Sequence, residues 1–342
     1  MNNAVDHVSR FSMGCGLGCF TTSALIKRNL KRGKVVFISC TLALFLFVTM
    51  RTWAITLIDA SQFSEILENF RDFEKFASVP FDQLITYTGR VAATFSEPML
   101  LVCILVFVIS RSSDSISGEL ARGTMEMIMA QPVGRKQFLL ASMVTVWIGI
   151  AGICIACYAA LYLSAHLNHV TEVERPPAIT VPGTEVDIPT DWLLEPKTTQ
   201  VPLADRIDFT TFAPAIIALF SMGFFVAGFT TMLSSFDKYR WRTVGIAVGF
   251  VVLQQMIGVI AKAKPELEFL GSFSFFWLYA PELFVSTLAN DPDKFWDPIL
   301  RYGDGYAQAG FTLGIGLLLL LGCAFYVIAL RIVTRRDLPA PL

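Results

Sequence analysis

The sequence is poor in the residues that enzymes use for catalysis. Only three histidines occur among its 342 residues, and charged residues make up 16% of the chain. It contains no H-E-x-x-H, G-x-S-x-G or G-x-x-x-x-G-K-[ST] segment, so the motifs of zinc proteases, α/β-type serine hydrolases and P-loop nucleotide sites are all missing. We therefore expect no catalytic residue, no metal site and no bound cofactor in this chain.

Long apolar runs dominate what is present. Hydrophobic residues make up 54% of the chain and the mean hydropathy is +0.58, which is more apolar than a soluble domain. Because backbone polar groups in hydrocarbon must be satisfied within their own segment, such runs should be helices. The sequence predicts an all-α integral membrane protein, one polytopic domain over residues 1–342. Its six transmembrane helices are expected at 35–58, 91–110, 138–165, 211–233, 243–261 and 307–333.

The basic residues are unevenly divided between the two sides. With a cytosolic N-terminus and six crossings, sixteen of the 27 basic residues fall on the inner side together with only six of the 28 acidic ones. The inner segments then carry a net charge of +10 and the outer segments −11. Since cytosolic loops are rich in Lys and Arg, we expect both termini in the cytosol and a multi-pass protein of a bacterial plasma (inner) membrane.

The first 34 residues form a basic cytosolic lead. Between Phe20 and Lys34, apolar residues recur among cations at helical spacing. This pattern favours an interfacial helix that lies on the inner leaflet before the first crossing. A basic flank that only sets the topology is the alternative.

Three outer segments join the crossings. Residues 59–90 carry apolar residues at helical spacing and predict an amphipathic helix on the outer face. Residues 166–208 contain six prolines, which argue against regular helix there. Residues 262–306 are rich in aromatic residues and contain Pro281, so we expect a re-entrant or interfacial hairpin before the last helix.

The inner segment 111–137 is longer than a connection between two membrane helices requires. Its apolar and charged residues recur at helical spacing, which predicts that Glu119, Arg122 and Glu126 face outward from the membrane. A Gly123-Thr124 pair should interrupt the helix. We expect this coupling segment to be offered to a cytosolic partner. The alternative is a simple connecting loop whose basic residues only set the orientation in the membrane.

The sequence of this segment resembles a family motif. E-L-A-R-G-T-M-E at 119–126 and Q-P-V-G-R at 131–135 are similar to the coupling region of ABC type 2 permeases, which reads E-x-x-x-G-T-L-E and then Q-P-V-S-R. Met125 replaces the leucine and Gly134 the serine. The six crossings, the basic N-terminal helix and the broken outer segment before the last crossing extend the resemblance over most of the chain.

The resemblance implies the membrane subunit of an ATP-driven transporter. ATP and Mg would be bound by a separately encoded cytosolic ABC ATPase that docks on the coupling segment. We expect a dimer with itself or with a related permease, contact with membrane lipid, and no nucleic-acid partner. The residues expected to couple the partner are Glu119, Arg122, Gly123, Thr124, Glu126, Gln131, Pro132 and Arg135.

Few polar residues lie deep in the crossings. Gln254 and Gln255 either line a translocation path or only form hydrogen bonds between helices. Gly245 and Gly249 form a small-xxx-small pair, which suits close helix contact within one subunit or across a dimer. The scarcity of buried charge favours an amphiphilic or apolar cargo.

Two functions remain open from the sequence. The leading one is a permease subunit of the exporter type, which couples a partner ATPase to substrate movement across the membrane. The alternative is a membrane anchoring or assembly protein that recruits a cytosolic factor without transport. A partner that lacks a nucleotide-binding motif would favour the alternative.

Overall fold

The structure confirms an all-α membrane protein. The computed structural model describes residues 3–57, 69, 81–131, 133–174, 179–180, 187–188, 197–263, 265–302 and 306–336. Within these residues, six helical segments are long and apolar enough to cross a membrane. They are Ser23–Thr56, Tyr87–Ser113, Arg135–Leu167, Phe209–Phe236, Arg240–Ala263 and Phe311–Arg335.

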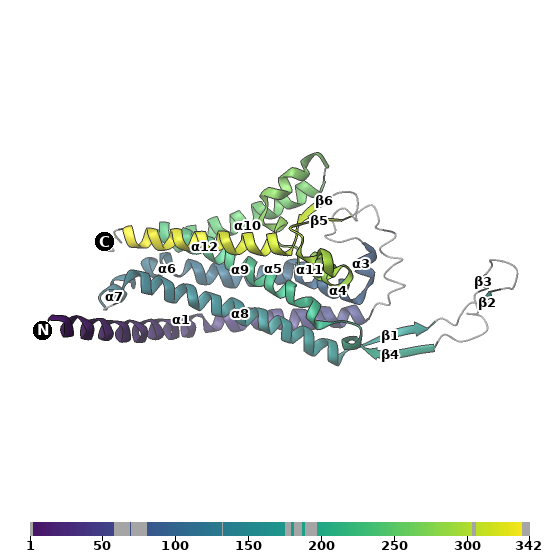
Figure 1. The fold of residues 1–342 in the computed structure, drawn as a ribbon, viewed down its shortest axis with the longest axis horizontal. Coiled ribbons are helices and arrows are strands. Elements are labelled where there is room, and N and C mark those ends of the chain that lie inside the picture. The colour runs from purple at the N-terminus through teal and green to yellow at the C-terminus, as the bar shows by residue number, and fades with distance from the viewer. Residues whose placement is uncertain are drawn as a thin grey trace.

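The six segments form one elongated bundle (Figure 1). At its centre, α9 (Ala213–Phe236) packs against its neighbours on several sides. These neighbours are α5 (Pro98–Ser113), α8 (Arg135–Leu167), α10 (Arg240–Ala263) and α12 (Phe311–Arg335). The apolar window of the segment containing α9 is 72% buried, whereas that of α10 is only 17% buried. Helix α10 therefore lies at the periphery and turns much of its apolar surface outward.

Two glycines bring α9 and α12 into close contact. A methyl group on Gly228 would lie 2.7 Å from the carbonyl oxygen of Gly322, so the two backbones meet where neither residue has a side chain. Trp147 of α8, Phe224 of α9 and Tyr326 of α12 pack beside this contact, with ring centroids 5.4, 5.4 and 5.1 Å apart. Three helices thus share one aromatic cluster.

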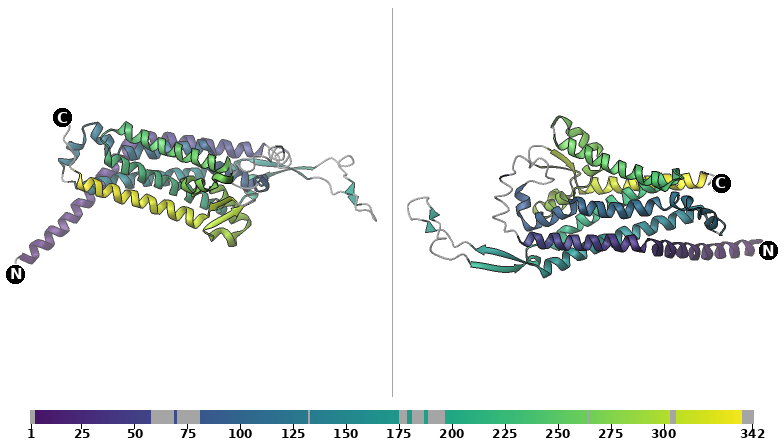
Figure 2. Two further views of the ribbon diagram at one scale, coloured as in Figure 1. Left: turned by 90° about the horizontal axis from the view of Figure 1, so that it is seen from above. Right: turned by 180° about the vertical axis from the view of Figure 1, so that it is seen from behind.

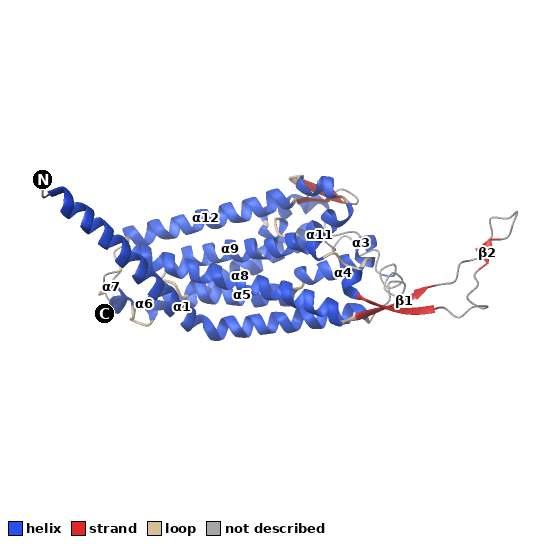
Figure 3. Cartoon of the chain, turned by 60° about the horizontal axis from the view of Figure 1, so that its bottom comes forward, coloured by secondary structure: helices blue, strands red, loops and turns tan. Residues whose placement is uncertain are grey.

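The first helix is longer than the sequence predicts. α1 (Asn3–Thr56) is continuous, so the predicted interfacial segment and the first crossing form one helix. No proline occurs before Pro80, and the backbone ladder is not interrupted where the boundary was expected. Figures 2 and 3 show the N-terminal part of α1 leaning away from the bundle. Its placement on the inner leaflet stays a prediction.

The second crossing is broken near one end. α3 (Phe81–Ile85) and α4 (Tyr87–Ala92) lead into the 3-10 helix η2 (Ala93–Ser96), and α5 begins at Pro98. Proline suits the first position of a helix because it has no N–H to leave unpaired there. The amphipathic helix predicted between residues 63 and 73 lies outside the described residues except for Asn69.

A hairpin projects from the bundle after α8 (Figure 1). β1 (His169–Glu174) pairs antiparallel with β4 (Lys197–Pro202), from His169 opposite Pro202 to Glu174 opposite Lys197. β2 (Ile179–Thr180) and β3 (Asp187–Ile188) pair farther out. The 3-10 helices η3 (Leu203–Asp205) and η4 (Phe209–Phe212) return the chain to α9. The described part of 168–208 holds no α-helix, as its prolines predict.

The segment before the last crossing folds into short elements. These are η5 (Pro265–Phe273), η6 (Phe275–Trp277), α11 (Pro281–Asn290), η7 (Pro292–Trp296) and the antiparallel pair β5 (Ile299–Tyr302) and β6 (Tyr306–Ala309). Helix α11 is largely buried and packs against α9, α4 and η2. This insertion among the helices is compatible with the predicted hairpin, whose depth in a membrane stays a prediction.

The two ends of the bundle differ in what they carry. Figure 1 shows both chain ends at one end of the bundle, together with α6 (Ser117–Ala121) and α7 (Met125–Met129). The hairpins and α11 lie at the opposite end. The coupling segment and both ends of the chain are therefore on the same side, which the charge distribution predicts to be the cytosol.

Candidate functional site

The coupling segment forms two short helices joined by a sharp turn. Gly123 lies between α6 and α7 and has a φ of 68°, a conformation that glycine adopts readily. The Thr124 N–H donates to the Glu119 carbonyl oxygen at 3.1 Å, and the Thr124 hydroxyl donates to the Glu119 carboxylate. The interruption lies where the Gly-Thr pair predicts it, and it links the start of α7 to α6.

A buried serine fixes α6 to the bundle. The Ser234 hydroxyl, at the inner end of α9, accepts from the N–H groups of Ile116 at 3.2 Å and Ser117 at 3.0 Å. It donates to the Ser113 carbonyl oxygen at 3.1 Å. The Thr243 hydroxyl of α10 donates to the Ser117 hydroxyl at 3.2 Å. Because these groups are buried, the start of α6 depends on them for its hydrogen bonds.

Glu119 does not face outward, which corrects the orientation that the helical spacing predicted for it. Its side chain is only 4% exposed. Its carboxylate accepts hydrogen bonds from Arg28 and Arg32 of α1, the first at 2.7 Å, and Arg122 lies 3.6 Å away. The hydrophobic pattern placed this carboxylate on the polar face, but the cations of α1 close over that face and compensate its burial. Glu119 therefore anchors α6 to α1.

Asp114 forms a second buried charge cluster just before α6. Arg122 donates to its carboxylate at 2.6 Å, and Arg111 and Arg240 lie 3.4 and 3.7 Å away. Burial alone would raise the pKa of this carboxyl, but the hydrogen bond from Arg122 and the surrounding guanidinium charges hold it below its ordinary value. Through Arg240 the cluster reaches α10, so the coupling segment is bound to three membrane helices.

Helix α7, unlike the buried start of α6, has one side exposed. Met125 and Ile128 are buried beneath it, while Glu126, Met127 and Ala130 are exposed. Met127 is 73% exposed, a high value for an apolar side chain. We call the exposed side of α7, with the turns before and after it, the α7 surface; its members are Arg122, Gly123, Glu126, Met127, Ala130 and Gln131.

The end of the coupling segment contacts the end of the chain. The exposed Arg135 side chain donates to the Arg336 carbonyl oxygen at 2.8 Å. Arg336 in turn donates to the carbonyl oxygens of Ser235 and Phe236 at 2.9 and 2.7 Å. The start of α8 is thereby joined to the ends of α12 and α9. Pro132 lies outside the described residues.

The two glutamines of α10 have different surroundings. The Gln254 side-chain oxygen accepts from the Phe275 N–H at 3.1 Å, so this side chain holds η6 against α10. Gln255 instead lines a cavity at the end of the bundle opposite the coupling segment. Of the two alternatives drawn from the sequence, Gln254 fits hydrogen bonding between elements. The translocation path stays a prediction for Gln255.

Sequence reasoning missed the residues that hold the coupling segment in place. Arg28 and Arg32 were interpreted only as cations of an interfacial helix, although their i, i+4 spacing puts both on one face that could meet a carboxylate. Asp114 and Ser234 were not singled out. A signal existed in the run of serines from 110 to 117 and in Ser234-Ser235, because hydroxyls gathered at helix ends require partners when buried.

The described residues hold no group of three or more His, Cys, Asp or Glu side chains that could bind a metal. The coupling segment therefore combines buried charged and hydroxyl groups around α6 with one exposed helix, α7. A model of the ABC-2 family transporter proteins matches residues 31–338. This chain belongs to the ABC-2 transporter family. No curated protein sequence matches the chain.

Family membership gives the chain its place in a transporter. The match extends over the coupling segment and all but the beginning of the first crossing. An ABC-2 protein of this kind is a membrane component of an ABC transporter, so this chain is a multi-pass permease subunit. The anchoring role drawn as an alternative from the sequence receives no support from this match.

Proposed function

We propose that this ABC-2 permease is an exporter subunit that couples a separately encoded cytosolic ATPase to the movement of a substrate across the membrane. The observation that carries the proposal is the contrast within the coupling segment. Helix α6 is fixed to the membrane helices by buried charges and hydroxyls, while α7 is exposed beside it. A partner would therefore find a docking surface with a rigid connection behind it.

The α7 surface has the chemistry of a modest docking site. Glu126 offers a carboxylate near the N-terminal end of α7, and Met127 offers an exposed, adaptable apolar side chain. Arg122 and Arg135 add donors at the two edges. We expect the ATPase to contribute an apolar groove for Met127 and a basic residue for Glu126. ATP and Mg would stay in the partner.

Movement of α7 would reach the crossings along three connections. The Thr124–Glu119 bond passes it to α6, and Glu119 passes it to Arg28 and Arg32 on α1. Ser234 passes it to α9. The Asp114 cluster passes it to α10 through Arg240. Each of these contacts has a buried partner in Glu119, Ser234 or Asp114, so we expect them to shift together as one body.

A dimer follows from the outward face of α10. A methyl group added at Gly245 or Gly249 would meet nothing within 4 Å, so this small-xxx-small pair serves no close packing between the described parts of the subunit. Val248 and Val252 on the same helix are 44% and 52% exposed. We propose that a second copy or a related permease packs here, in a bacterial plasma membrane with the coupling segment in the cytosol.

The test is co-purification of the ATPase with charge-reversal variants. Glu126→Arg should lower partner recovery at least tenfold, because it replaces an exposed acid of the α7 surface by a base. Asp293→Arg reverses an exposed acid at the opposite end of the bundle and should leave recovery unchanged. Equal recovery with both variants would contradict the docking proposal. A captured partner without ATPase activity would favour an anchoring role instead.

A further inference from the structure

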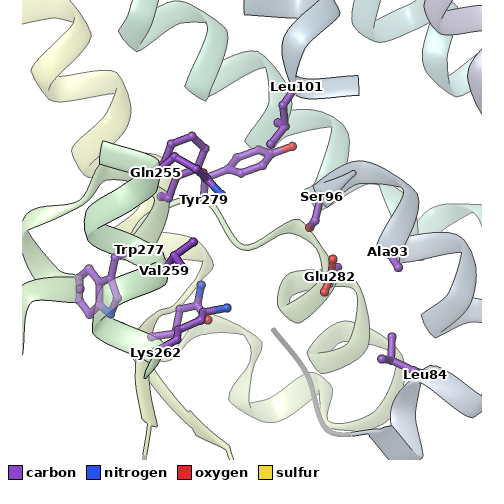
Figure 4. A pocket seen from close by; sticks show the side chains of 14 residues that line it. Leu84, Ala93, Ser96, Leu101, Gln255, Val259, Lys262, Trp277, Tyr279 and Glu282 are labelled. Atoms are coloured by element: carbon purple, nitrogen blue, oxygen red, sulfur yellow. The ribbon is translucent and has the colours of Figure 1, made fainter. Parts of the chain in front are cut away.

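A cavity of about 430 Å³ lies at the end of the bundle opposite the coupling segment (Figure 4). It opens between α10, the η2–α5 region, the η5–η6 segment, α11 and β6. Small-ligand sites usually measure about 300–1,000 Å³. The cavity is thus large enough to hold a small molecule or one polar end of a larger one, and the charge distribution predicts that it is on the outer side.

Phe276, Trp277 and Tyr279 form an aromatic wall of the cavity. Hydrogen bonds of this segment hold the wall in place. The Ser274 hydroxyl donates to the Gln254 carbonyl oxygen of α10 at 2.8 Å. The Trp277 indole N–H donates to the Ala307 carbonyl oxygen of β6 at 2.7 Å, and the Tyr279 hydroxyl donates to the Phe95 carbonyl oxygen of η2 at 2.7 Å. Three neighbouring elements therefore fix this wall, and the cavity does not depend on a ligand for its shape.

Two opposite charges line the cavity from different elements. Lys262 belongs to α10 and Glu282 to α11, and Figure 4 shows them on separate sides of the space. They interact electrostatically. Gln255 and Gln308 add amide groups to the lining. Both Glu282 and Gln308 are only 8% exposed, so these two lining residues are largely removed from bulk water.

This lining matches a head group that itself carries two charges. A phosphate would face Lys262 and the amides, while an ammonium group would face Glu282. A purely anionic ligand would place its charge against Glu282, and a purely cationic ligand would place its charge against Lys262.

One side of the cavity borders the apolar surface of the bundle. Val259 lines the cavity and is 52% exposed. Met256 and Ile260, on the same helix, are 56% and 44% exposed. In a membrane this outer part of α10, beyond the glycine pair proposed for the dimer, would contact acyl chains. A lipid could therefore place its head group in the cavity and its chains along α10.

We propose that the cavity binds the head group of a zwitterionic phospholipid that carries an ammonium and a phosphate. Binding requires no ATPase, so it stands apart from the proposed coupling. It is tested on the purified full-length chain in detergent, by native mass spectrometry during titration with phosphatidylethanolamine or phosphatidylglycerol. The two lipids share the phosphate, and only the first has the ammonium. The wild-type chain should bind phosphatidylethanolamine about tenfold more tightly.

Two variants separate the two charges. Glu282→Gln should remove the preference between the lipids, because the ammonium loses its anionic partner. Lys262→Gln should weaken binding of both lipids about tenfold and is the safer variant for folding, since Lys262 is only partly buried. Leu46→Ala, which changes an exposed residue of α1 outside the lining, should bind like the wild type. Equal affinity of the wild type for both lipids, or unchanged binding by Lys262→Gln, would overturn the proposal.

Soluble phosphoethanolamine distinguishes a lipid from a free head group. It carries an ammonium and a phosphate without acyl chains, although its phosphate is a monoester with more negative charge than the diester of the lipid. If the lipid is the ligand, phosphoethanolamine should displace it only at concentrations at least a hundredfold above the dissociation constant of the lipid. Displacement at equal concentration would overturn the assignment to a lipid.

Discussion

The two helices of the coupling segment are alike in sequence and opposite in environment. Both α6 and α7 have five residues and a glutamate in the first turn. The Glu119 side chain is 4% exposed and surrounded by arginines, whereas Glu126 is exposed. The difference comes from α1, whose Arg28 and Arg32 cover α6. Whether a carboxylate in such a segment anchors the helix or stays exposed for docking thus depends on whether basic side chains of another helix cover it.

Removing the anchor should produce the largest loss of stability. Glu119→Ala leaves Arg28, Arg32 and Arg122 without their shared partner. We expect a loss of about 2 kcal/mol, below the ~3–5 kcal/mol of a fully buried pair, because the arginines are partly exposed and water screens them. Thermal unfolding in detergent measures it. Glu126→Ala should change stability by less than about 0.5 kcal/mol. Equal losses would contradict the contrast between the helices.

The Ser234 hydroxyl should rank next. Ser234→Ala leaves the buried N–H groups of Ile116 and Ser117 without this acceptor, which should lower stability by about 1–2 kcal/mol. Ser235→Ala is the matched control, since the Ser235 hydroxyl bonds only to Thr231 of its own helix. Melting temperatures of the two variants decide the point. A control that loses as much as Ser234→Ala would show that α6 does not depend on this hydroxyl.

The turn between the helices should tolerate a side chain poorly. Gly123→Ala places a methyl group in open space but keeps a φ of 68°, which costs a non-glycine residue about 1 kcal/mol. Gly134→Ala, at a φ of −70°, should be nearly neutral. Melting temperature again reports the change. If Gly123→Ala is as stable as Gly134→Ala, the sharp turn is not a constraint on the segment.

Acid should weaken the Asp114 cluster by the smallest of these amounts. Because the pKa of Asp114 is held below its ordinary value of 3.8 in the folded chain, its contribution to stability is complete at neutral pH. It declines as the pH falls below 3.8 toward the lowered pKa. Melting temperatures between pH 7 and pH 3 should fall less steeply for Asp114→Asn than for the wild type. Parallel curves would exclude this contribution.

The features that could be predicted from the sequence are those determined by residues close together in the chain. Six apolar runs give six crossings because a run of about 20 residues has few other folds in hydrocarbon. Gly123 could be predicted to break the coupling segment because glycine adopts a positive φ readily, whatever residues surround it. The partners of Glu119 were not predictable in this way. They lie 87 and 91 residues away, and helical spacing assigns a face without saying what covers it.

The surroundings of Gln254 and Gln255 show the same limit. The two neighbours look equivalent in sequence. One accepts a hydrogen bond from Phe275, 21 residues away, and the other lines a cavity. Their roles were set by the fold of the segment that follows α10, which contains 3-10 helices and a short hairpin. Periodicity has little to say about such irregular elements.

The central claim is that α7, not α6, meets the ATPase. A photo-reactive amino acid at Met127, which is 73% exposed, should crosslink to the ATPase in cells that produce both proteins. The same amino acid at Phe269, 62% exposed at the other end of the bundle, should give no such product. Crosslinking from Met127 alone is the result that the account predicts. A crosslink to the ATPase from Phe269 and none from Met127 would contradict it.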